Sequence, residues 1–107
     1  MNELLHGTVD TLILKTLSGG RRHGYGIAQA IEEETDGVVT IEDGSLYPAL
    51  YRLEKKDWVE AEWGLSELGR RAKFYRLTPK GRRQLTAQTA EWTRFAVAIS
   101  KVLVPNP

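Results

Sequence analysis

The chain has 107 residues, fifteen of them Lys or Arg and fourteen Asp or Glu, which suits one small domain with almost no net charge. It contains no cysteine and only two histidines, which excludes disulfide frameworks, thiolate zinc sites and cysteine nucleophiles, so we expect no metal and no cofactor. The longest apolar run, Phe95 to Ile99, is far shorter than the roughly 20 residues that span a bilayer. We therefore expect a cytoplasmic protein that does not contact a membrane.

The near-neutral total hides an uneven distribution of charge. Residues 27–67 contain eleven acidic and three basic side chains, whereas residues 70–83 contain seven basic and no acidic ones. A basic block of this kind is typical of proteins that bind polyanions. On charge alone, a solvated basic turn followed by a helix start explains it equally well.

Apolar spacing predicts two helices in the first third of the chain. The first begins near Thr8, with an extension toward Asn2 left open, and ends at Ser18-Gly19-Gly20. The second covers residues 23–35, and Gly37 follows it as a left-handed terminator. The β-branched segment 38–41 is too short for a helix and predicts a minor strand.

A third helix is predicted from an N-cap at Asp43 to about Lys56. Pro48 lies within it, and Gly44, four residues earlier, leaves room for the proline ring. Leu46, Leu50 and Leu53 share one face, and the opposite face is formed by Ser45, Pro48, Arg52 and Lys55. A helix with a small-and-basic outer face is shaped to enter a groove, although an ordinary amphipathic surface helix is the more common alternative. Tyr47 and Tyr51 lie between the two faces and are interpreted as packing residues.

The rest of the chain predicts a hairpin and a long helix. Residues 58–63 and 73–77 alternate as strands, and the long loop between them ends in Arg70, Arg71 and Lys73. Glu60 and Glu62 on the first strand are interpreted as solvated. Thr78-Pro79 starts a helix that runs to about Leu103. Its apolar stripe consists of two interleaved series with a spacing of seven: Leu85, Trp92 and Ile99, and Gln88, Phe95 and Val102.

This order of elements predicts a mainly α (α+β) fold, a winged helix-turn-helix with a long C-terminal dimerisation helix. Residues 1–78 would form the DNA-binding domain, whose third helix enters the major groove while the hairpin, or wing, contacts the adjacent backbone. Residues 79–107 would form the dimerisation helix, since its stripe is too wide to leave in water. The alternative is that this helix folds back on its own domain.

Several segments also resemble the PadR family of bacterial transcriptional regulators, in its short subgroup with a single C-terminal dimerisation helix. The matching segments are Leu12-Ile13-Leu14 with Leu17, His23-Gly24-Tyr25-Gly26-Ile27, Gly44-Ser45-Leu46-Tyr47-Pro48-Ala49-Leu50, Arg52-Leu53-Glu54, Glu62-Trp63-Gly64, Gly69-Arg70-Arg71, Arg76-Leu77-Thr78 and Glu91-Trp92. Four residues depart from the family pattern: Asp57 replaces a usual glycine, Trp58 a smaller aliphatic residue, and Leu65 and Leu68 make the wing less polar. Asp57 tolerates the left-handed conformation that the turn requires.

The resemblance implies a homodimer that binds a palindromic operator in double-stranded DNA, represses transcription and is released by a small molecule. Together with the residue patterns, it gives three predicted sites. The predicted DNA-binding residues are Tyr25, Gly44, Ser45, Pro48, Arg52, Lys55, Arg70, Arg71 and Lys73. The predicted dimer interface consists of Leu5, Val9, Leu85, Gln88, Trp92, Phe95, Ile99 and Val102. A planar aromatic effector would stack at Trp92, Phe95 and Ala96 near the two-fold axis.

Two other functions are alternatives to DNA binding. A winged helix can act as a protein–protein interaction module without operator binding, its basic wing then meeting an acidic partner surface. An enzyme is the weaker alternative, because the sequence has no Gly-rich phosphate loop, metal constellation or catalytic triad. We therefore expect a protein that is not an enzyme.

Overall fold

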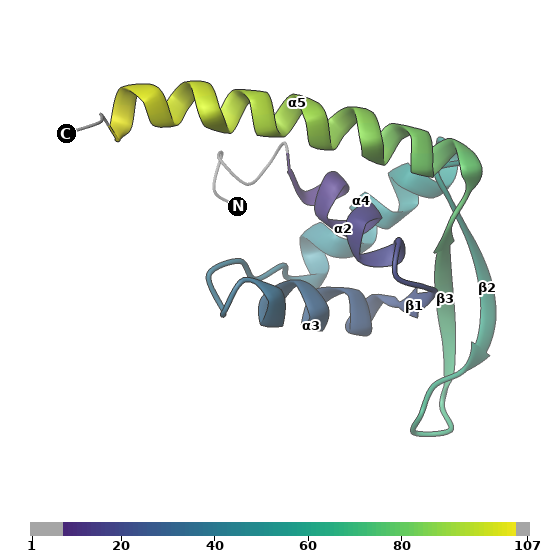
Figure 1. Ribbon diagram of the computed structural model, residues 1–107. Coiled ribbons are helices and arrows are strands. Elements are labelled where there is room, and N and C mark those ends of the chain that lie inside the picture. Colours follow the sequence, from purple (N-terminus) through teal and green to yellow (C-terminus); the bar gives the residue numbers. More distant parts are fainter. Residues whose placement is uncertain (1–7, 105–107) are drawn as a thin grey trace.

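The computed structural model describes residues 8–104 (Figure 1). Three short helices and a three-stranded sheet precede one long helix, α5 (Figure 1). In chain order the elements are α2 (Val9–Leu17), β1 (Arg22–His23), α3 (Gly24–Glu34), α4 (Asp43–Lys55), β2 (Val59–Leu65), β3 (Arg71–Leu77) and α5 (Pro79–Leu103). Within this part of the chain, no helix combines the length and apolar character needed to cross a membrane.

A single apolar core joins α2, α3, α4 and the base of the hairpin. Its buried members are Val9, Ile13, Leu14, Leu17, Ile27, Ile31, Ile41, Leu46, Ala49, Leu50, Leu53, Val59, Tyr75 and Leu77. The helical members recur every three or four residues, as the sequence pattern predicts for helices with one buried face. The core therefore fixes which side of α4 points outward.

The sheet has the order β1-β3-β2, with both pairs antiparallel. The hairpin strands pair from Val59 with Leu77 to Leu65 with Arg71, so both strands are longer than predicted and the loop between them is shorter. β1, on the other edge of β3, was not predicted, because two residues are too few to give a recognisable alternation. In Figure 1 the hairpin extends away from the helices as a wing.

The predicted strand at residues 38–41 is wrong. These residues form an irregular connection between α3 and α4. The chain turns at Asp36 and Gly37, both with positive φ, but Asp36 is the left-handed residue that directly follows the C-cap Thr35, so the terminator predicted at Gly37 is one position late. Val39 N then donates to the Thr35 hydroxyl at 3.0 Å, and Ile41 enters the core. In this segment Val39 and Ile41 pack against the core and Val38 is exposed, so its β-branched side chains do not form a strand.

The two ends of α4 lie close to their predicted positions. Asp43 is the first helical residue, and Glu42 is the N-cap without a side-chain hydrogen bond, so the predicted N-cap is wrong by one position. The Asp43 carboxylate still lies in the first turn, where it suits the helix dipole. Pro48 is accommodated inside a continuous helix. At the other end, Asp57 adopts φ 61°, the left-handed conformation predicted for it.

The start of α5 is held by the cap that Thr78-Pro79 predicts. The Thr78 hydroxyl accepts a hydrogen bond from Gly81 N at 3.0 Å and donates one to the carbonyl of Asp57 at 2.6 Å. Farther along, Leu85 packs against the core and Thr11 donates to the Gln88 side-chain oxygen at 2.7 Å. The first half of α5 is thus attached to the winged helix, whereas its C-terminal half extends past α2 (Figure 1). The domain boundary at residue 78 stays a prediction.

Candidate nucleic-acid interface

The predicted outer face of α4 is divided between two surfaces. Pro48 and Lys55 are exposed on the side opposite the core, as predicted, and Gly44 is exposed as well. Ser45 instead lies in a groove beside α2, together with Thr8 and Thr11. Arg52 also turns toward α2, where its Nη2 lies 3.0 Å from the carboxylate of Asp10. Half of the predicted stripe therefore faces the rest of the domain.

Two tyrosines of α4 are exposed in addition to Pro48 and Lys55. Tyr51 is 62% exposed, so interpreting it as a packing residue was wrong, whereas Tyr47 is 46% exposed and packs its ring against Gly24. The ammonium of Lys55 lies 5.5 Å from the centre of the Tyr51 ring. At 3.6 residues per turn, Pro48 and Lys55 fall opposite the buried leucines, Tyr51 and Arg52 lie about equally far to either side of them, and Tyr47 and Ser45 lie at the two margins. Angles around the helix alone therefore do not separate the tyrosines from Ser45 and Arg52, because that depends on which side of α4 packs against α2.

The N-terminus of α3 adjoins this face through a close contact with Tyr47. A Cβ at Gly24 would lie 2.8 Å from both Cε1 and the hydroxyl oxygen of Tyr47, so only glycine leaves the ring in place. Next to it, the Tyr25 side chain is largely exposed, so its hydroxyl is accessible to a phosphate, and the predicted contact itself stays a prediction. The start of α3 is capped by His23, whose Nδ1 accepts from Gly26 N at 3.0 Å. Three tyrosines from two helices therefore contribute to one exposed region.

The wing joins α4 through an ion pair and a buried phenol. Lys73 Nζ lies 3.3 Å from the Glu54 carboxylate, so this predicted DNA ligand is partly neutralised by α4. Burial raises the pKa of the neighbouring Tyr75 phenol, and the positive charge of Lys73 acts against that rise. The wing base is consequently fixed against the helix.

The other predicted wing cations are exposed. Within residues 8–104, no ion pair involves Arg70 or Arg71. The Arg71 guanidinium carbon lies 4.8 Å from the centre of the Trp63 ring, a cation–π contact that leaves its charge available. The backbone N–H of Arg70 donates to the Ser66 hydroxyl at 3.3 Å in the wing turn. These two arginines therefore have charge to offer a polyanion.

Two carboxylates on β2, those of Glu60 and Glu62, are paired with cations of the same chain. Glu62 lies 3.0 Å from Arg21, and Glu60 lies 2.7 Å from Arg76, so interpreting both as merely solvated was incomplete. The hydrogen bond to Glu60 raises the pKa of Arg76 further above its ordinary value. These pairs reduce the net negative charge that bound DNA would meet on the wing.

The predicted dimer residues are distributed over the core, the α2–α5 contact and an exposed stripe. Val9 is only 2% exposed in the core, so it has little surface to offer another chain, and Leu5 lies outside the described residues. Leu85 and Gln88 contact the core and α2. The remaining four, Trp92, Phe95, Ile99 and Val102, are exposed. They continue the side of α5 that packs on the core.

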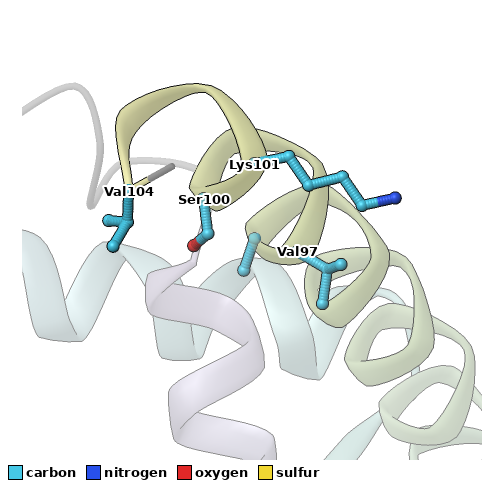
Figure 2. Close-up of a pocket in the computed structure, with 5 residues that line it drawn as sticks. Val97, Ser100, Lys101 and Val104 are labelled. Carbon is cyan, nitrogen blue, oxygen red and sulfur yellow. The ribbon is translucent and has the colours of Figure 1, made fainter. Parts of the chain in front are cut away.

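Two hollows lie along α5. An open groove of about 1230 Å³ lies between α2, the α3–α4 connection and α5, and Trp92 lines it. A smaller hollow of about 400 Å³ is lined by Ala96, Val97, Ser100, Lys101 and Val104. Figure 2 shows the Lys101 side chain extending away from Ser100 and Val104. Within one chain, therefore, the predicted effector residues do not share a cavity: Trp92 borders the groove, Ala96 the smaller hollow, and Phe95 lines neither.

Within residues 8–104, no three His, Asp or Glu side chains form a group that could hold a metal ion.

These features define the class of winged helix proteins with a long C-terminal helix, and comparison with known proteins gives the family. Residues 13–87 match the transcriptional regulator PadR-like family, and the chain belongs to it. The resemblance noted in the sequence is thereby confirmed, and the family is one of transcriptional regulators and not a class of enzymes.

The chain is also similar to individual proteins along most of its length. Protein X of Lysinibacillus sphaericus is 34% identical over 91 residues, which cover 85% of this chain and 84% of that protein. A transcriptional regulator from Clostridium thermocellum has a TM-score of 0.85 and 34% identity, covering 94% of this chain and 97% of that one. A PadR-like transcriptional regulator from Bacillus cereus has a TM-score of 0.83 and 27% identity, covering 98% and 100%.

Proposed function

We propose that this protein is a sequence-specific DNA-binding regulator, a repressor that acts as a homodimer on a palindromic operator. The observation that carries the proposal is the joining of two surfaces by the Lys73–Glu54 ion pair: the outward face of α4 and the wing with its exposed Arg70 and Arg71. A helix that enters the major groove beside a cationic hairpin on the backbone is the docking geometry of winged helix-turn-helix proteins.

The proposed DNA contacts follow the exposed surface. From α3 and α4 we assign Tyr25, Gly44, Tyr47, Pro48, Tyr51 and Lys55 to the groove and its edges, with Arg70 and Arg71 on phosphates. Lys73 contributes less, because Glu54 neutralises part of its charge. Ser45 and Arg52 support α4 from the side of α2, and we give them no base contact.

The homodimer is proposed on α5. The stripe of Trp92, Phe95, Ile99 and Val102 continues the core-facing side of the helix into solvent. Apolar surface of this extent is typical of an interface, and a second copy of α5 is its natural cover. A two-fold dimer would present two α4 helices to half-sites roughly 10 bp, or a small multiple, apart.

Release by an effector is proposed at the same dimer seam. Trp92, Phe95 and Ala96 would meet their copies near the two-fold axis, and a planar aromatic molecule would stack between the indoles. A ligand that favours a different separation of the two α4 helices would lower operator affinity. Quenching of Trp92 emission in a Trp58→Phe/Trp63→Phe variant tests this, and a Trp92→Ala variant that binds the same compound equally well contradicts it.

Fluorescence anisotropy of a labelled mixed-sequence duplex tests DNA binding directly. We expect affinity to fall steeply with salt, and the Arg70→Ala/Arg71→Ala variant to lower the salt slope by about two phosphate contacts per protomer. The matched control is Arg94→Ala/Lys101→Ala, which removes two exposed cations from α5 and leaves the slope unchanged. Duplex binding that is absent at low salt, with a protein partner bound through the wing, would favour the interaction module instead.

A further inference from the structure

The sheet face that packs on α4 continues beyond the core. Cross-strand pairs Val59–Leu77 and Ala61–Tyr75 lie at the core end of this face. The next two pairs on the same face are Trp63–Lys73 and Leu65–Arg71, because side chains of a strand alternate between faces. We call these four residues the inner wing strip. The Lys73–Glu54 contact shows that the strip starts beside α4.

The inner wing strip alternates apolar and cationic groups. Trp63 is 59% exposed and Leu65 is 69% exposed, both on β2, while Lys73 and Arg71 oppose them on β3. The Arg71 guanidinium rests 4.8 Å from the Trp63 ring centre. On the opposite face of the hairpin, by contrast, Glu60 and Glu62 form ion pairs with cations of the same chain. The inner wing strip is therefore the wing face with apolar surface left exposed.

If the wing contacted only phosphates, the exposed Trp63 indole and the Leu65 side chain would add no affinity for DNA. The sugar–phosphate backbone of a duplex alternates anionic phosphates with the largely apolar edges of deoxyribose rings. Cations beside apolar side chains match that alternation, and the indole N–H can also donate to a phosphate oxygen. An acidic protein surface could also pair with the arginine, but it does not repeat apolar and anionic groups at regular intervals as the duplex backbone does.

We propose that the inner wing strip binds the DNA backbone through sugars as well as phosphates, with Trp63 packed against a deoxyribose and Arg71 on the neighbouring phosphate. The inference rests on the proposed function and adds to it a DNA-contacting residue, Trp63, that carries no charge. Leu65 extends the same contact toward the wing tip. Because the contact is to the backbone, it does not depend on base sequence.

The experiment uses a mixed-sequence duplex of about 30 bp at low salt, where backbone contacts dominate binding. Wild-type protein and Trp63→Phe are titrated while tryptophan emission is recorded, and we expect most of the DNA-dependent change to disappear in the variant. In anisotropy titrations, Trp63→Ala should weaken binding about tenfold with an unchanged salt slope, because an apolar contact releases no counterion. Arg71→Ala should lower that slope by about one phosphate contact per protomer.

Controls separate the possible results. Val38→Ala removes a similarly exposed apolar side chain from the α3–α4 connection and should leave affinity unchanged. Thermal unfolding of Trp63→Phe and Trp63→Ala verifies that both variants fold.

An equal change in tryptophan emission in wild type and Trp63→Phe would overturn the inference while DNA binding stands. A slope lowered as much in Trp63→Ala as in Arg71→Ala would also overturn it, because Trp63 would then act only by holding Arg71. No duplex binding by the wild type at low salt would refute the proposed function itself.

Discussion

Arg52 of α4 donates a hydrogen bond from Nη2 to the Asp10 carboxylate of α2, at 3.0 Å. The contact joins residues 42 positions apart in the chain and holds the side of α4 that faces the groove. The Arg52 side chain is still 53% exposed, so the ion pair joins this predicted DNA-binding residue to α2 without removing it from the surface. We propose that its main role is to hold α4 against α2.

The first prediction is a modest, salt-sensitive coupling between Asp10 and Arg52. Both side chains are partly exposed, so a double-mutant cycle with Asp10→Ala and Arg52→Ala should give about 0.5 to 1 kcal/mol in urea unfolding, falling in high salt. Pairing Asp10→Ala with Lys101→Ala should give no coupling. Arg52→Ala should alter stability more than preference among duplexes. A changed base preference without coupling would restore Arg52 to the interface.

The second prediction concerns Gly24 beneath Tyr47. A methyl group at position 24 meets the Tyr47 ring, so Gly24→Ala should move the ring and weaken duplex binding. Adding Gly24→Ala to Tyr47→Ala should produce no further loss, because the obstructing ring is already gone. Gly44→Ala is the comparison for stability: its Cβ would have nothing within 4 Å, and we expect about 0.5 to 1 kcal/mol of stabilisation. Additive losses of affinity at positions 24 and 47 would show that the contact is irrelevant to binding.

The third prediction concerns the two hydrogen bonds of Thr78. Thr78→Val keeps the shape of the side chain but removes both the cap to Gly81 and the bond to Asp57, which should destabilise the protein by about 1 to 2 kcal/mol. Thr78→Ser retains the hydroxyl and should lose far less. Equal unfolding midpoints for the two variants would mean that the cap does not hold α5.

The fourth prediction follows from the raised pKa of Tyr75. Since burial raises its pKa above the ordinary 10.0, the unfolded chain ionises at lower pH than the folded chain. The contribution of the neutral Tyr75 phenol to the free energy of unfolding is therefore fully present below about pH 10, and it is lost as the pH rises through the pKa of the folded state. Tyr75→Phe has no such ionisation, so its urea midpoint should fall less between about pH 9 and pH 11. Parallel pH profiles would contradict a buried, neutral phenol.

The fifth prediction tests the exposed stripe of α5. Phe95→Glu places a charge in the proposed seam and should convert the dimer into a folded monomer, because an unpaired buried charge destabilises an interface by several kcal/mol. Thr93→Glu puts the same charge on the solvent side of the helix and should leave the dimer intact. Sedimentation of both variants is the measurement. A Phe95→Glu variant that remains dimeric at wild-type affinity would place the interface elsewhere.

The sequence was sufficient to predict features that depend only on residues adjacent in the chain, such as caps, turns and helical periodicity. The Thr78 cap, the left-handed Asp57 and the heptad-like stripe of α5 were all readable, because each depends on a few adjacent positions. The strand predicted at residues 38–41 failed because pairing requires a neighbouring strand, which the local sequence does not specify.

The candidate interface could be predicted from the sequence only in part, because several of its contacts join residues that are far apart in the chain. The hydrogen bond between Thr11 and Gln88 and the ion pair between Arg21 and Glu62 join positions far apart in sequence, so no local pattern indicates them. Ser45 and Arg52 share the polar character of an outer face, yet they lie at its margin against α2. Their true orientation depends on where α2 packs, a tertiary relationship that periodicity along α4 leaves undetermined.

Selection of bound duplexes from a random-sequence library tests the central claim most directly. A two-fold dimer that reads DNA with α4 predicts a recovered consensus with two inverted half-sites, their centres roughly 10 bp or a small multiple apart. The Phe95→Glu variant should fail to recover the paired consensus. A library that yields no enriched sequence, or a single half-site with no symmetric partner, would contradict the account.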